Sequence, residues 1–352
     1  MVTAYVVDYG SSAVTPINTI TNVAGKPIKV GQPPGVIAIT PDGKTAYVVS
    51  AINDNKNVPG TVTPINIATN TAGKPIKAGI GPVAIAITPD GKTAYVVNDN
   101  NYNPITPRQG TVTPISTATN TAGKPIKVGR APSAIAITPN GKTAYVVNDQ
   151  SNTVIPIRTS TNTPGKPIKV RRYPFAIAIT PNGKTAYVAS LTSDSVTPIR
   201  TATNTAGKPI RIEPDTAGSA AIAITPDGKT AYVANSNSDT VTPIRTATNT
   251  AGKPIKVRRY PFAMAITPNG KTAYVSYNNS RMITPINIAT NTAGKPIRAG
   301  RGASVSAITP DGTTAYVANY NSDTVTPICT ASDTAGKPIR VGRNPSYIAI
   351  TP

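Results

Sequence analysis

The sequence predicts an all-β fold, an eight-bladed β-propeller with four antiparallel strands in each blade. Three observations lead to this prediction. The tetrapeptide Thr-Ala-Tyr-Val occurs eight times, and the tripeptide Ile-Thr-Pro occurs eight times after an alanine, as Ala-Ile-Thr-Pro. Successive copies are spaced by roughly 42 residues or more, which is the length of a propeller blade.

Each repeat contains four short extended segments, which we call strands a, b, c and d. In one representative copy they span residues 134–138, 143–147, 153–157 and 165–170. β-Branched residues dominate these segments and no helical period is present, which favours strands. Pro followed by Asn-Gly or Asp-Gly separates strand a from strand b and predicts a tight turn, because Pro presets φ and Gly accepts a positive φ.

Strands c and d each contain a proline, which cannot donate a hydrogen bond to a neighbouring strand. In strand d, the outermost strand, the proline and the flanking Lys or Arg would prevent pairing between sheet edges. In strand c the proline predicts a short or bulged strand.

The order of the segments predicts how the ring closes. The chain begins with strand b of one repeat and ends with strand a, at Ile348–Pro352. The last segment would therefore complete the first blade, giving one propeller over residues 1–352 with no separate second domain. The tyrosines of Thr-Ala-Tyr-Val are expected to pack between blades: Tyr5, Tyr47, Tyr95, Tyr145, Tyr187, Tyr232, Tyr274 and Tyr316.

The repeats differ in length only in the b–c and d–a connections. Extra residues occur around 53–59, 102–109 and 213–219, while the spacings across the a–b and c–d connections are constant. Connections of the two kinds lie on opposite sides of a blade. The variable side is therefore expected to carry any specific function, and the constant side to be framework.

The chain is strongly basic, with 35 Lys and Arg, 14 Asp and Glu and a formal net charge of +21. This excess favours anionic partners or, equally, serves solubility. The sequence has no histidine and one cysteine, Cys329. Ser-His-Asp triads, His general bases and His-based metal sites are thereby excluded, so we assign no catalytic residue, no metal ligand and no cofactor.

No apolar run is long enough for a transmembrane helix, and no signal peptide is recognisable in this chain. Because the sequence opens inside a strand, we expect it to be part of a longer protein.

The d–a connections hold the candidate ligand-binding residues. They include two copies of Arg-Arg-Tyr-Pro-Phe, at residues 171–175 and 258–262. Arginine suits carboxylate or phosphate because its planar fork can bind both oxygens, and nearby aromatic side chains can stack. The predicted site at the channel mouth consists of Arg130, Arg171, Arg172, Tyr173, Phe175, Arg258, Arg259, Tyr260, Phe262, Arg301 and Arg343.

A structural alternative stays open for these arginines. The same side carries nine acidic residues, which could pair with the arginines and make them purely structural. They are Asp8, Asp54, Asp99, Asp149, Asp194, Glu213, Asp215, Asp239 and Asp323. Seven tyrosines outside the Thr-Ala-Tyr-Val motif are also placed on this side: Tyr9, Tyr102, Tyr173, Tyr260, Tyr277, Tyr320 and Tyr347.

The segment Asp90-Gly-Lys-Thr-Ala-Tyr-Val-Val-Asn98, with Asn152-Thr-Val and Thr201-Ala-Thr-Asn-Thr205, resembles the YVTN β-propeller repeats. The resemblance covers all eight repeats. It implies an extracytoplasmic or cell-surface propeller and carries over no catalytic residue. Similar propellers include lactonase-like and lyase-like enzymes, which generally rely on groups that this chain lacks.

The leading hypothesis is a non-enzymatic binding or scaffold module for an anionic glycan, a cell-wall polymer or another anionic ligand. Nucleic acid is a weaker candidate, and a monomer is favoured. One alternative is a lactonase-like or lyase-like enzyme using Asp, Tyr or Arg in the channel. The other is a structural repeat protein of the surface-layer type.

Overall fold

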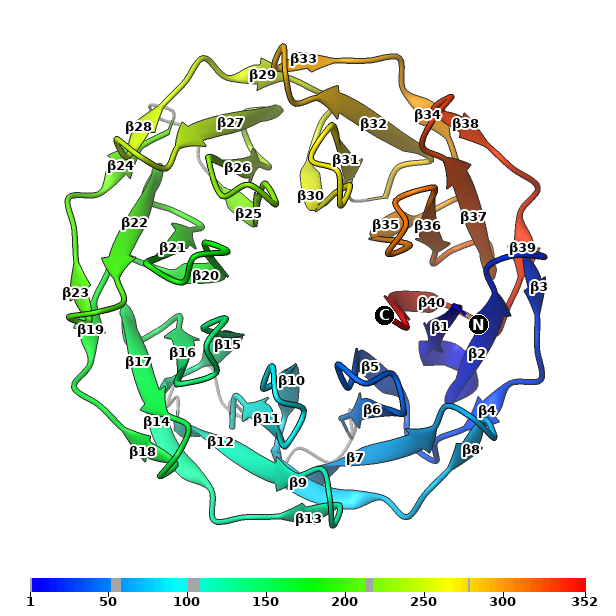
Figure 1. The fold of residues 1–352 in the computed structure, drawn as a ribbon, viewed down its shortest axis with the longest axis horizontal. Coiled ribbons are helices and arrows are strands. Elements are labelled where there is room, and N and C mark those ends of the chain that lie inside the picture. Colours follow the sequence, from blue (N-terminus) through cyan, green and yellow to red (C-terminus); the bar gives the residue numbers. More distant parts are fainter. Residues whose placement is uncertain (1, 52–57, 101–107, 213–217, 278) are drawn as a thin grey trace. The chain divides into compact units, whose positions relative to one another are not determined.

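The computed structural model describes residues 2–51, 58–100, 108–212, 218–277 and 279–352. These residues form eight antiparallel sheets, and the chain is the predicted eight-bladed β-propeller (Figure 1). By internal contacts the chain divides into two compact units: unit 1 is Met1–Pro33 with Ile212–Pro352, and unit 2 is Pro34–Arg211. That the whole chain is one domain stays a prediction.

Unit 2 contains blades 2 to 5, each a sheet of strands a, b and c followed by a divided strand d. Blade 2 is β5 (Pro34–Ile39), β6 (Thr45–Ser50), β7 (Pro59–Asn66), β8 (Thr71–Ala72) and β9 (Ile76–Ile80); blade 3 is β10 (Pro82–Ile87), β11 (Thr93–Asn98), β12 (Gln109–Ser116), β13 (Thr121–Ala122) and β14 (Ile126–Arg130); blade 4 is β15 (Pro132–Ile137), β16 (Thr143–Asn148), β17 (Thr153–Arg158), β18 (Thr163–Pro164) and β19 (Ile168–Lys169); blade 5 is β20 (Pro174–Ile179), β21 (Thr185–Ser190), β22 (Ser195–Arg200), β23 (Thr205–Ala206) and β24 (Ile210–Arg211).

Unit 1 contains blades 6 to 8 and blade 1. Blade 6 is β25 (Ser219–Ile224), β26 (Thr230–Asn235), β27 (Thr240–Arg245), β28 (Thr250–Ala251) and β29 (Ile255–Lys256); blade 7 is β30 (Pro261–Ile266), β31 (Thr272–Tyr277), β32 (Met282–Asn287), β33 (Thr292–Ala293) and β34 (Ile297–Arg298); blade 8 is β35 (Ala303–Ile308), β36 (Thr314–Asn319), β37 (Thr324–Cys329), β38 (Thr334–Ala335) and β39 (Ile339–Arg340); blade 1 is β40 (Pro345–Ile350), β1 (Thr3–Asp8), β2 (Ala13–Asn18), β3 (Val23–Ala24) and β4 (Ile28–Lys29), with a 3-10 turn at Tyr9–Ser11.

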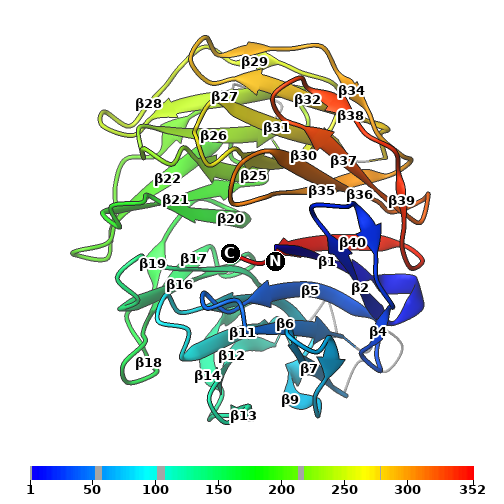
Figure 2. The same cartoon turned by 45° about the vertical axis from the view of Figure 1, so that its right-hand side comes forward.

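Blade 1 is completed by the two ends of the chain. The last strand, β40, pairs antiparallel with the first, β1, with Val6 opposite Ile348 (Figure 2). The predicted closure of the N-terminal blade by the C-terminal strand is therefore confirmed.

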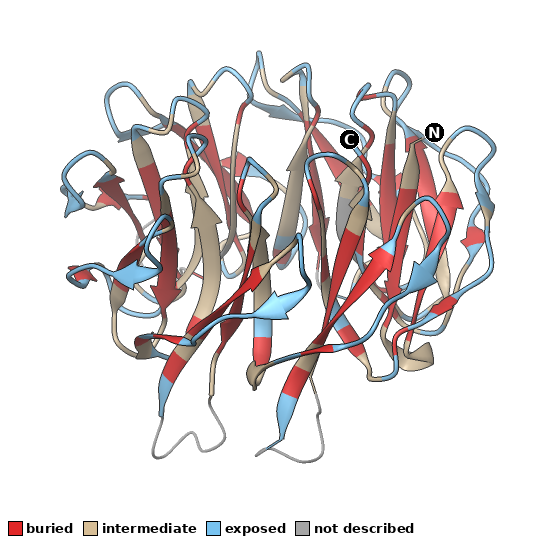
Figure 3. Cartoon of the chain, turned by 60° about the horizontal axis from the view of Figure 1, so that its bottom comes forward, coloured by how far each residue is buried: buried red, intermediate tan, exposed pale blue. Residues whose placement is uncertain are grey.

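The core lies between neighbouring blades. Successive side chains of a strand point to opposite faces of its sheet, so strand b contributes to two interfaces. In unit 2, Tyr95 and Val97 of blade 3 pack in one cluster with Ala144 and Val146 of blade 4. Figure 3 shows the result, with buried strand centres and exposed connections.

The predicted tyrosine packing is confirmed for the copies whose contacts are described. Tyr145 of blade 4 is fully buried, and its hydroxyl donates a 2.6 Å hydrogen bond to Asn204 Oδ1 in the c–d turn of blade 5. Asn204 has a positive φ of 54°, a conformation that asparagine tolerates better than most residues. The same bond joins Tyr47 to Asn120, Tyr95 to Asn162, Tyr232 to Asn291 and Tyr316 to Asn22, and Tyr274 makes it to Asp333.

The prediction that the proline makes strand c short or bulged is wrong at the proline itself. Strand β17 pairs with β16 without a bulge, and Pro156 lies opposite Tyr145 in that register. The missing N–H of Pro156 faces strand d, where β18 and β19 are separated at Gly165–Pro167 and no ladder donor is needed. Gly165 N–H still donates to the Pro156 carbonyl at 2.7 Å.

The expected irregularities occur elsewhere. Strand d, predicted as one segment, is divided into two short strands in each blade. Register shifts lie between strands a and b, as between Pro132 and Ala134, and in blades 2 and 3 also between strands c and d, at Pro59/Thr61 and Gln109/Thr111. We call the side of a blade that carries the a–b and c–d turns the a–b side, and the opposite side the b–c side.

Candidate functional site

A buried polar position ends strand b on the b–c side. Its occupants are Asp8, Ser50, Asn98, Asn148, Ser190, Asn235, Tyr277 and Asn319, and each is at most 1% exposed. In blade 4, Asn148 Oδ1 accepts the Gly129 N–H of blade 3 at 2.9 Å. Gly79 and Asn98, and Gly300 and Asn319, make the same bond at 3.0 Å. This position therefore joins consecutive blades.

The glycine in this contact is required by the close approach of the next blade. A Cβ added to Gly129 would lie 2.6 Å from Asn148 Cγ, which is closer than real Cβ contacts. Gly79, Gly300 and Gly342 face the same obstacle from Asn98, Asn319 and Asp8. At the equivalent position the two Arg-Arg-Tyr turns carry Arg171 and Arg258, where the next strand b ends in Ser190 or Tyr277 instead of Asn.

The residue after this glycine is arginine in three junctions, and its backbone is held identically in each. The main-chain N–H groups of Arg130, Arg301 and Arg343 donate to serine hydroxyls of the following blade, Ser151, Ser322 and Ser11, at 2.7, 2.7 and 2.6 Å. The side chains of all three are exposed. The fold therefore fixes the base of each arginine and leaves its guanidinium accessible to a ligand.

The third residue of the d–a turn has a left-handed backbone. Tyr173 has a φ of 51° and Tyr260 a φ of 59°, an unfavourable conformation for a bulky side chain. Their N–H groups donate to Asn152 Oδ1 at 3.0 Å and to Asp239 Oδ1 at 3.1 Å. The tyrosine side chains are 46% and 55% exposed, so the turn holds aromatic rings out into solvent.

The phenylalanines occupy a different place from the one predicted. Phe175 and Phe262 are second residues of strands β20 and β30, so the turns themselves end at Tyr173 and Tyr260. Phe262 is 43% exposed and Phe175 is half-buried.

Two of the tyrosines that were assigned to the variable side belong to strands. Tyr277 ends β31, is fully buried and donates to Thr284 Oγ1 at 2.6 Å. Tyr347 lies within β40 and is 37% exposed, and desolvation raises its pKa. Tyr102 lies outside the described residues.

Two acidic residues of this side accept backbone N–H groups. Asp239 and Asp323, both with positive φ, accept the N–H groups of Tyr260 and Asn344. Asp239 Oδ2 also forms an exposed ion pair of 4.0 Å with Arg259 Nε, a type of contact worth at most about 1 kcal/mol. Pairing of arginines with aspartates is thus present at Arg259, while Asp54 and Asp215 lie outside the described residues, as does Glu213.

Asp8 was predicted as a loop acid but is the fully buried end of β1. Its Oδ2 accepts the Thr15 hydroxyl at 2.5 Å, while Oδ1 is a buried atom without a hydrogen-bond partner. The pKa of Asp8 is raised to about 7, mainly by burial and to a smaller extent by the nearby Asp323, against the opposing effect of the bonds from Thr15 and the Gly342 backbone.

The predicted site residues thus form a run of consecutive turns in each unit. Unit 2 presents Arg130, then Arg171, Arg172, Tyr173 and Phe175; unit 1 presents Arg258, Arg259, Tyr260 and Phe262, then Arg301 and Arg343. The described part of the chain contains no group of three His, Cys, Asp or Glu side chains that could hold a metal ion. The arrangement offers cations and aromatic rings, which suit binding of anions.

Concave features on the a–b side were not predicted from the sequence. Pockets of about 860 and 640 Å³ lie there within unit 2, around the turns of blades 4 and 5. The side predicted to be framework therefore contains recesses as well.

The fold and these turns define a β-propeller repeat protein. Residues 65–211 match the sequence model of the family described as "Lactonase, 7-bladed beta-propeller". No curated protein matches the chain significantly. Among the described residues, no helix is long and apolar enough to span a membrane.

Several solved structures resemble most or nearly all of the chain. Hydrazine synthase of Kuenenia stuttgartiensis is 26% identical, with a TM-score of 0.68 over 88% of this chain and 99% of that one. Dihydro-heme d1 dehydrogenase NirN, in complex with DHE, is 18% identical with a TM-score of 0.81 over 99% and 74%. Apo AztD of Citrobacter koseri is 13% identical with a TM-score of 0.70 over 99% and 97%. At such identities the last two similarities concern the fold only.

Proposed function

We propose that this protein is a non-enzymatic binding or scaffold propeller that engages an anionic ligand or polymer through its arginine-bearing d–a turns. The supporting observation is the shared construction of Arg130, Arg301 and Arg343, whose main chains are fixed and whose side chains are exposed. Repeated cations on rigid supports favour a ligand with repeated anionic groups, because little backbone freedom remains to be lost on binding.

The two Arg-Arg-Tyr turns add aromatic surface to this charge. Tyr173 and Tyr260 are held in a strained backbone conformation with their rings exposed. Strain retained at an exposed side chain is typical of functional sites. A cell-wall polymer or other anionic glycan fits the extracytoplasmic location that the YVTN resemblance implies.

Replacement of the four arginines of these turns tests the proposal. The variant R171A/R172A/R258A/R259A is compared with K26A/K74A/K253A/K295A, which removes the same charge from exposed lysines between the two parts of strand d. Binding to polygalacturonate, dextran sulfate and neutral dextran is measured at low salt. We expect about tenfold weaker binding of the anionic polymers by the arginine variant only. Equal losses in the two variants would refute the site.

A lactonase-like enzyme is the second candidate, supported by the family match over residues 65–211. Hydrolysis of a lactone panel by the purified protein, followed by proton release, tests it. Turnover that survives the four-arginine replacement would favour this candidate over the binding module. A surface-layer role predicts instead self-assembly of the purified chain into sheets, which light scattering detects.

A further inference from the structure

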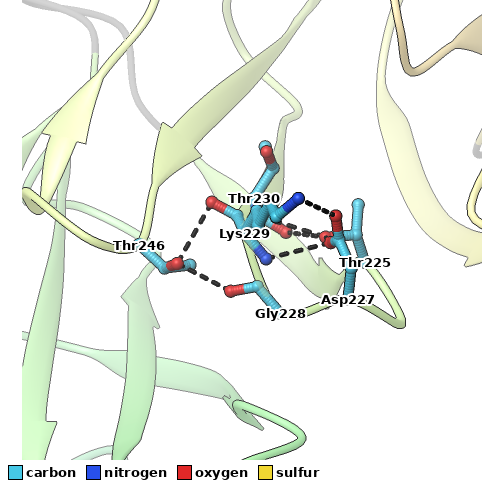
Figure 4. Close-up of polar contacts among 6 residues, drawn as sticks. All are labelled: Thr225, Asp227, Gly228, Lys229, Thr230 and Thr246. Carbon is cyan, nitrogen blue, oxygen red and sulfur yellow. Dashed lines mark hydrogen bonds and ion pairs between the residues drawn. The ribbon is translucent and has the colours of Figure 1, made fainter.

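The a–b turn is built alike in every blade that has a described a–b turn, and blade 6 illustrates it (Figure 4). The Thr225 hydroxyl donates to Asp227 Oδ1 at 2.6 Å, and the Lys229 N–H donates to the same oxygen at 3.0 Å. The Thr246 hydroxyl, from the c–d turn, donates to the Gly228 carbonyl at 2.6 Å. Lys229 Nζ lies 3.6 Å from Asp227 Oδ2, so the turn's cation is partly neutralised by its own carboxylate.

Blades 4 and 5 keep this turn but lack the carboxylate. Asn140 and Asn182 accept the threonine hydroxyls of Thr138 and Thr180 at 2.7 Å, as the aspartate does. The amide carries no charge, so it offers no ion pair to the lysine of the turn. These turns therefore preserve the geometry of Asp227 while removing its negative charge.

The same two blades add a second cation where strand c ends. Arg158 and Arg200 occupy positions that are Asn66 in blade 2 and Ser116 in blade 3. In blades 2 and 3 the lysine of each a–b turn is balanced by Asp42 or Asp90, whereas blades 4 and 5 each carry two exposed cations and no acid in that turn. Lys142, Arg158, Lys184 and Arg200 thus concentrate positive charge on neighbouring blades of unit 2.

These cations line two neighbouring recesses. The pocket of about 860 Å³ includes Asn140, Lys142 and Arg158, together with Asp90 at the blade 3 turn. The pocket of about 640 Å³ includes Lys142, Lys184 and Arg200. Asn140, Lys142 and Thr143 line both pockets, so the two recesses adjoin and could accommodate consecutive units of one chain.

We propose that this a–b side recess of blades 4 and 5 is a second binding site, specific for an acidic polysaccharide. Its four cations would meet carboxylate or sulfate groups, and the side chains of Thr159, Ser160 and Thr163 would meet sugar hydroxyls. None of the described lining residues of either pocket is aromatic. Stacking of unpaired bases, on which binding of single-stranded nucleic acid depends, therefore has no support here.

The test restores the missing carboxylates. Because Asp90 and Asp227 hold the same turn in blades 3 and 6, the variant N140D/N182D is expected to fold normally while two charges are added beside the cations. Its control is K253Q/K295Q, which changes the net charge equally at exposed positions in unit 1. Both are made in the R171A/R172A/R258A/R259A background, so that failure of the proposed function does not affect the result.

Binding to immobilised polygalacturonate, dextran sulfate, neutral dextran and oligo(dT) is measured at about 50 and 300 mM NaCl. We expect N140D/N182D to lose about tenfold in affinity for the acidic polysaccharides at the lower salt, and the control to lose less than about twofold. The two acidic polymers distinguish carboxylate from sulfate recognition, either of which supports the proposal. Affinity of N140D/N182D within about twofold of its parent, or stronger binding of oligo(dT) that is lost in the same variant, would overturn it.

Discussion

The two ends of strand b differ in how much their buried residues vary from blade to blade. At its start, the third residue is tyrosine in every copy, and within each unit its hydroxyl reaches the c–d turn of the next blade, as from Tyr145 to Asn204. At its end, the sixth residue faces the preceding blade, and its identity changes between Asn, Ser, Asp and Tyr. Both ends are fully buried, so burial does not explain why one is uniform and the other varies.

The difference follows from what each end contacts. Within each unit the tyrosine meets a c–d turn of constant length, so the same hydrogen bond recurs from blade to blade. The sixth residue meets the d–a connection, which changes from Gly129-Arg130 to Arg171-Arg172 between successive junctions. The residue at the end of strand b therefore varies together with the candidate binding turn that it contacts.

Truncation at the uniform end should have the largest effect. Y145A removes a fully buried ring and its hydrogen bond, and we expect a loss of about 3–5 kcal/mol in the free energy of unfolding. Y145F, which loses the hydroxyl only, should cost about 1–2 kcal/mol. Urea denaturation measures both, and Y316F should match Y145F because its bond to Asn22 is the same. If Y145F and Y316F lost clearly different amounts of unfolding free energy, the tyrosine contact would not be equivalent in these two blades.

The acidic occupant of the variable end should make stability depend on pH. The pKa of Asp8 is about 7 in the folded protein and near 4 in an unfolded chain. The folded state thus retains a proton that the unfolded state releases, so the free energy of unfolding falls as the pH rises from about 4 to about 7. The full loss is on the order of 4 kcal/mol.

D8N removes this dependence and supplies the amide found in the same place at Asn319, whose Nδ2 donates to Thr326 at 2.9 Å. We expect the variant to be more stable than the parent by on the order of 4 kcal/mol at pH 8 and unchanged at about pH 4. N319D should instead introduce such a pH dependence at the neighbouring junction, so that stability falls as the pH rises. Parallel pH profiles for D8N and the parent, from thermal or urea unfolding, would disprove the assignment of this pH dependence to Asp8.

The glycine that faces the variable end should tolerate a larger residue only where the facing side chain at the end of strand b is smaller. G129A would place Cβ 2.6 Å from Asn148 Cγ, and we expect a cost of about 2 kcal/mol. N148S, which copies the serine that faces Arg171 at the next junction, should relieve only the contact with the amide group, because the Cβ of residue 148 also lies 2.6 Å from the added Cβ. A double-mutant cycle measured by urea unfolding should therefore show coupling of at least about 1 kcal/mol. Strictly additive effects would mean that the two positions vary independently.

Much of this framework could be predicted from the sequence. The repeated Thr-Ala-Tyr-Val and Ile-Thr-Pro motifs specify strands a and b, and their order specifies closure of blade 1, which the pairing of β1 with β40 confirms. The regularity of strand c was not predicted because Pro156 was considered without its neighbour. Only the register shows that its missing N–H faces the break in strand d.

The candidate sites were only partly predictable. The arginines of the d–a turns stand out as departures from the repeat, but the burial of Asp8 was missed because it was read as a loop residue. A signal was present, since Asp8 aligns with Asn98, Asn148 and Asn319 directly after Thr-Ala-Tyr-Val-Val or Thr-Ala-Tyr-Val-Ala. The basic recess of blades 4 and 5 was overlooked because alternation of Asp and Asn in a turn was read as structural equivalence.

The smallest predicted effect concerns strain in the turns that adjoin the variable end. Tyr173 adopts a φ of 51°, while the equivalent Asn344 adopts 54°, a conformation that costs asparagine less than tyrosine. Y173N should therefore stabilise unit 2 by about 0.5–1 kcal/mol, and N344Y should destabilise blade 1 by a similar amount. If Tyr173 is retained for binding, Y173N should also weaken binding of anionic polymer in the assay used for the arginine variants. A stabilised Y173N that binds as well as the parent would show that the ring contributes to neither stability nor recognition.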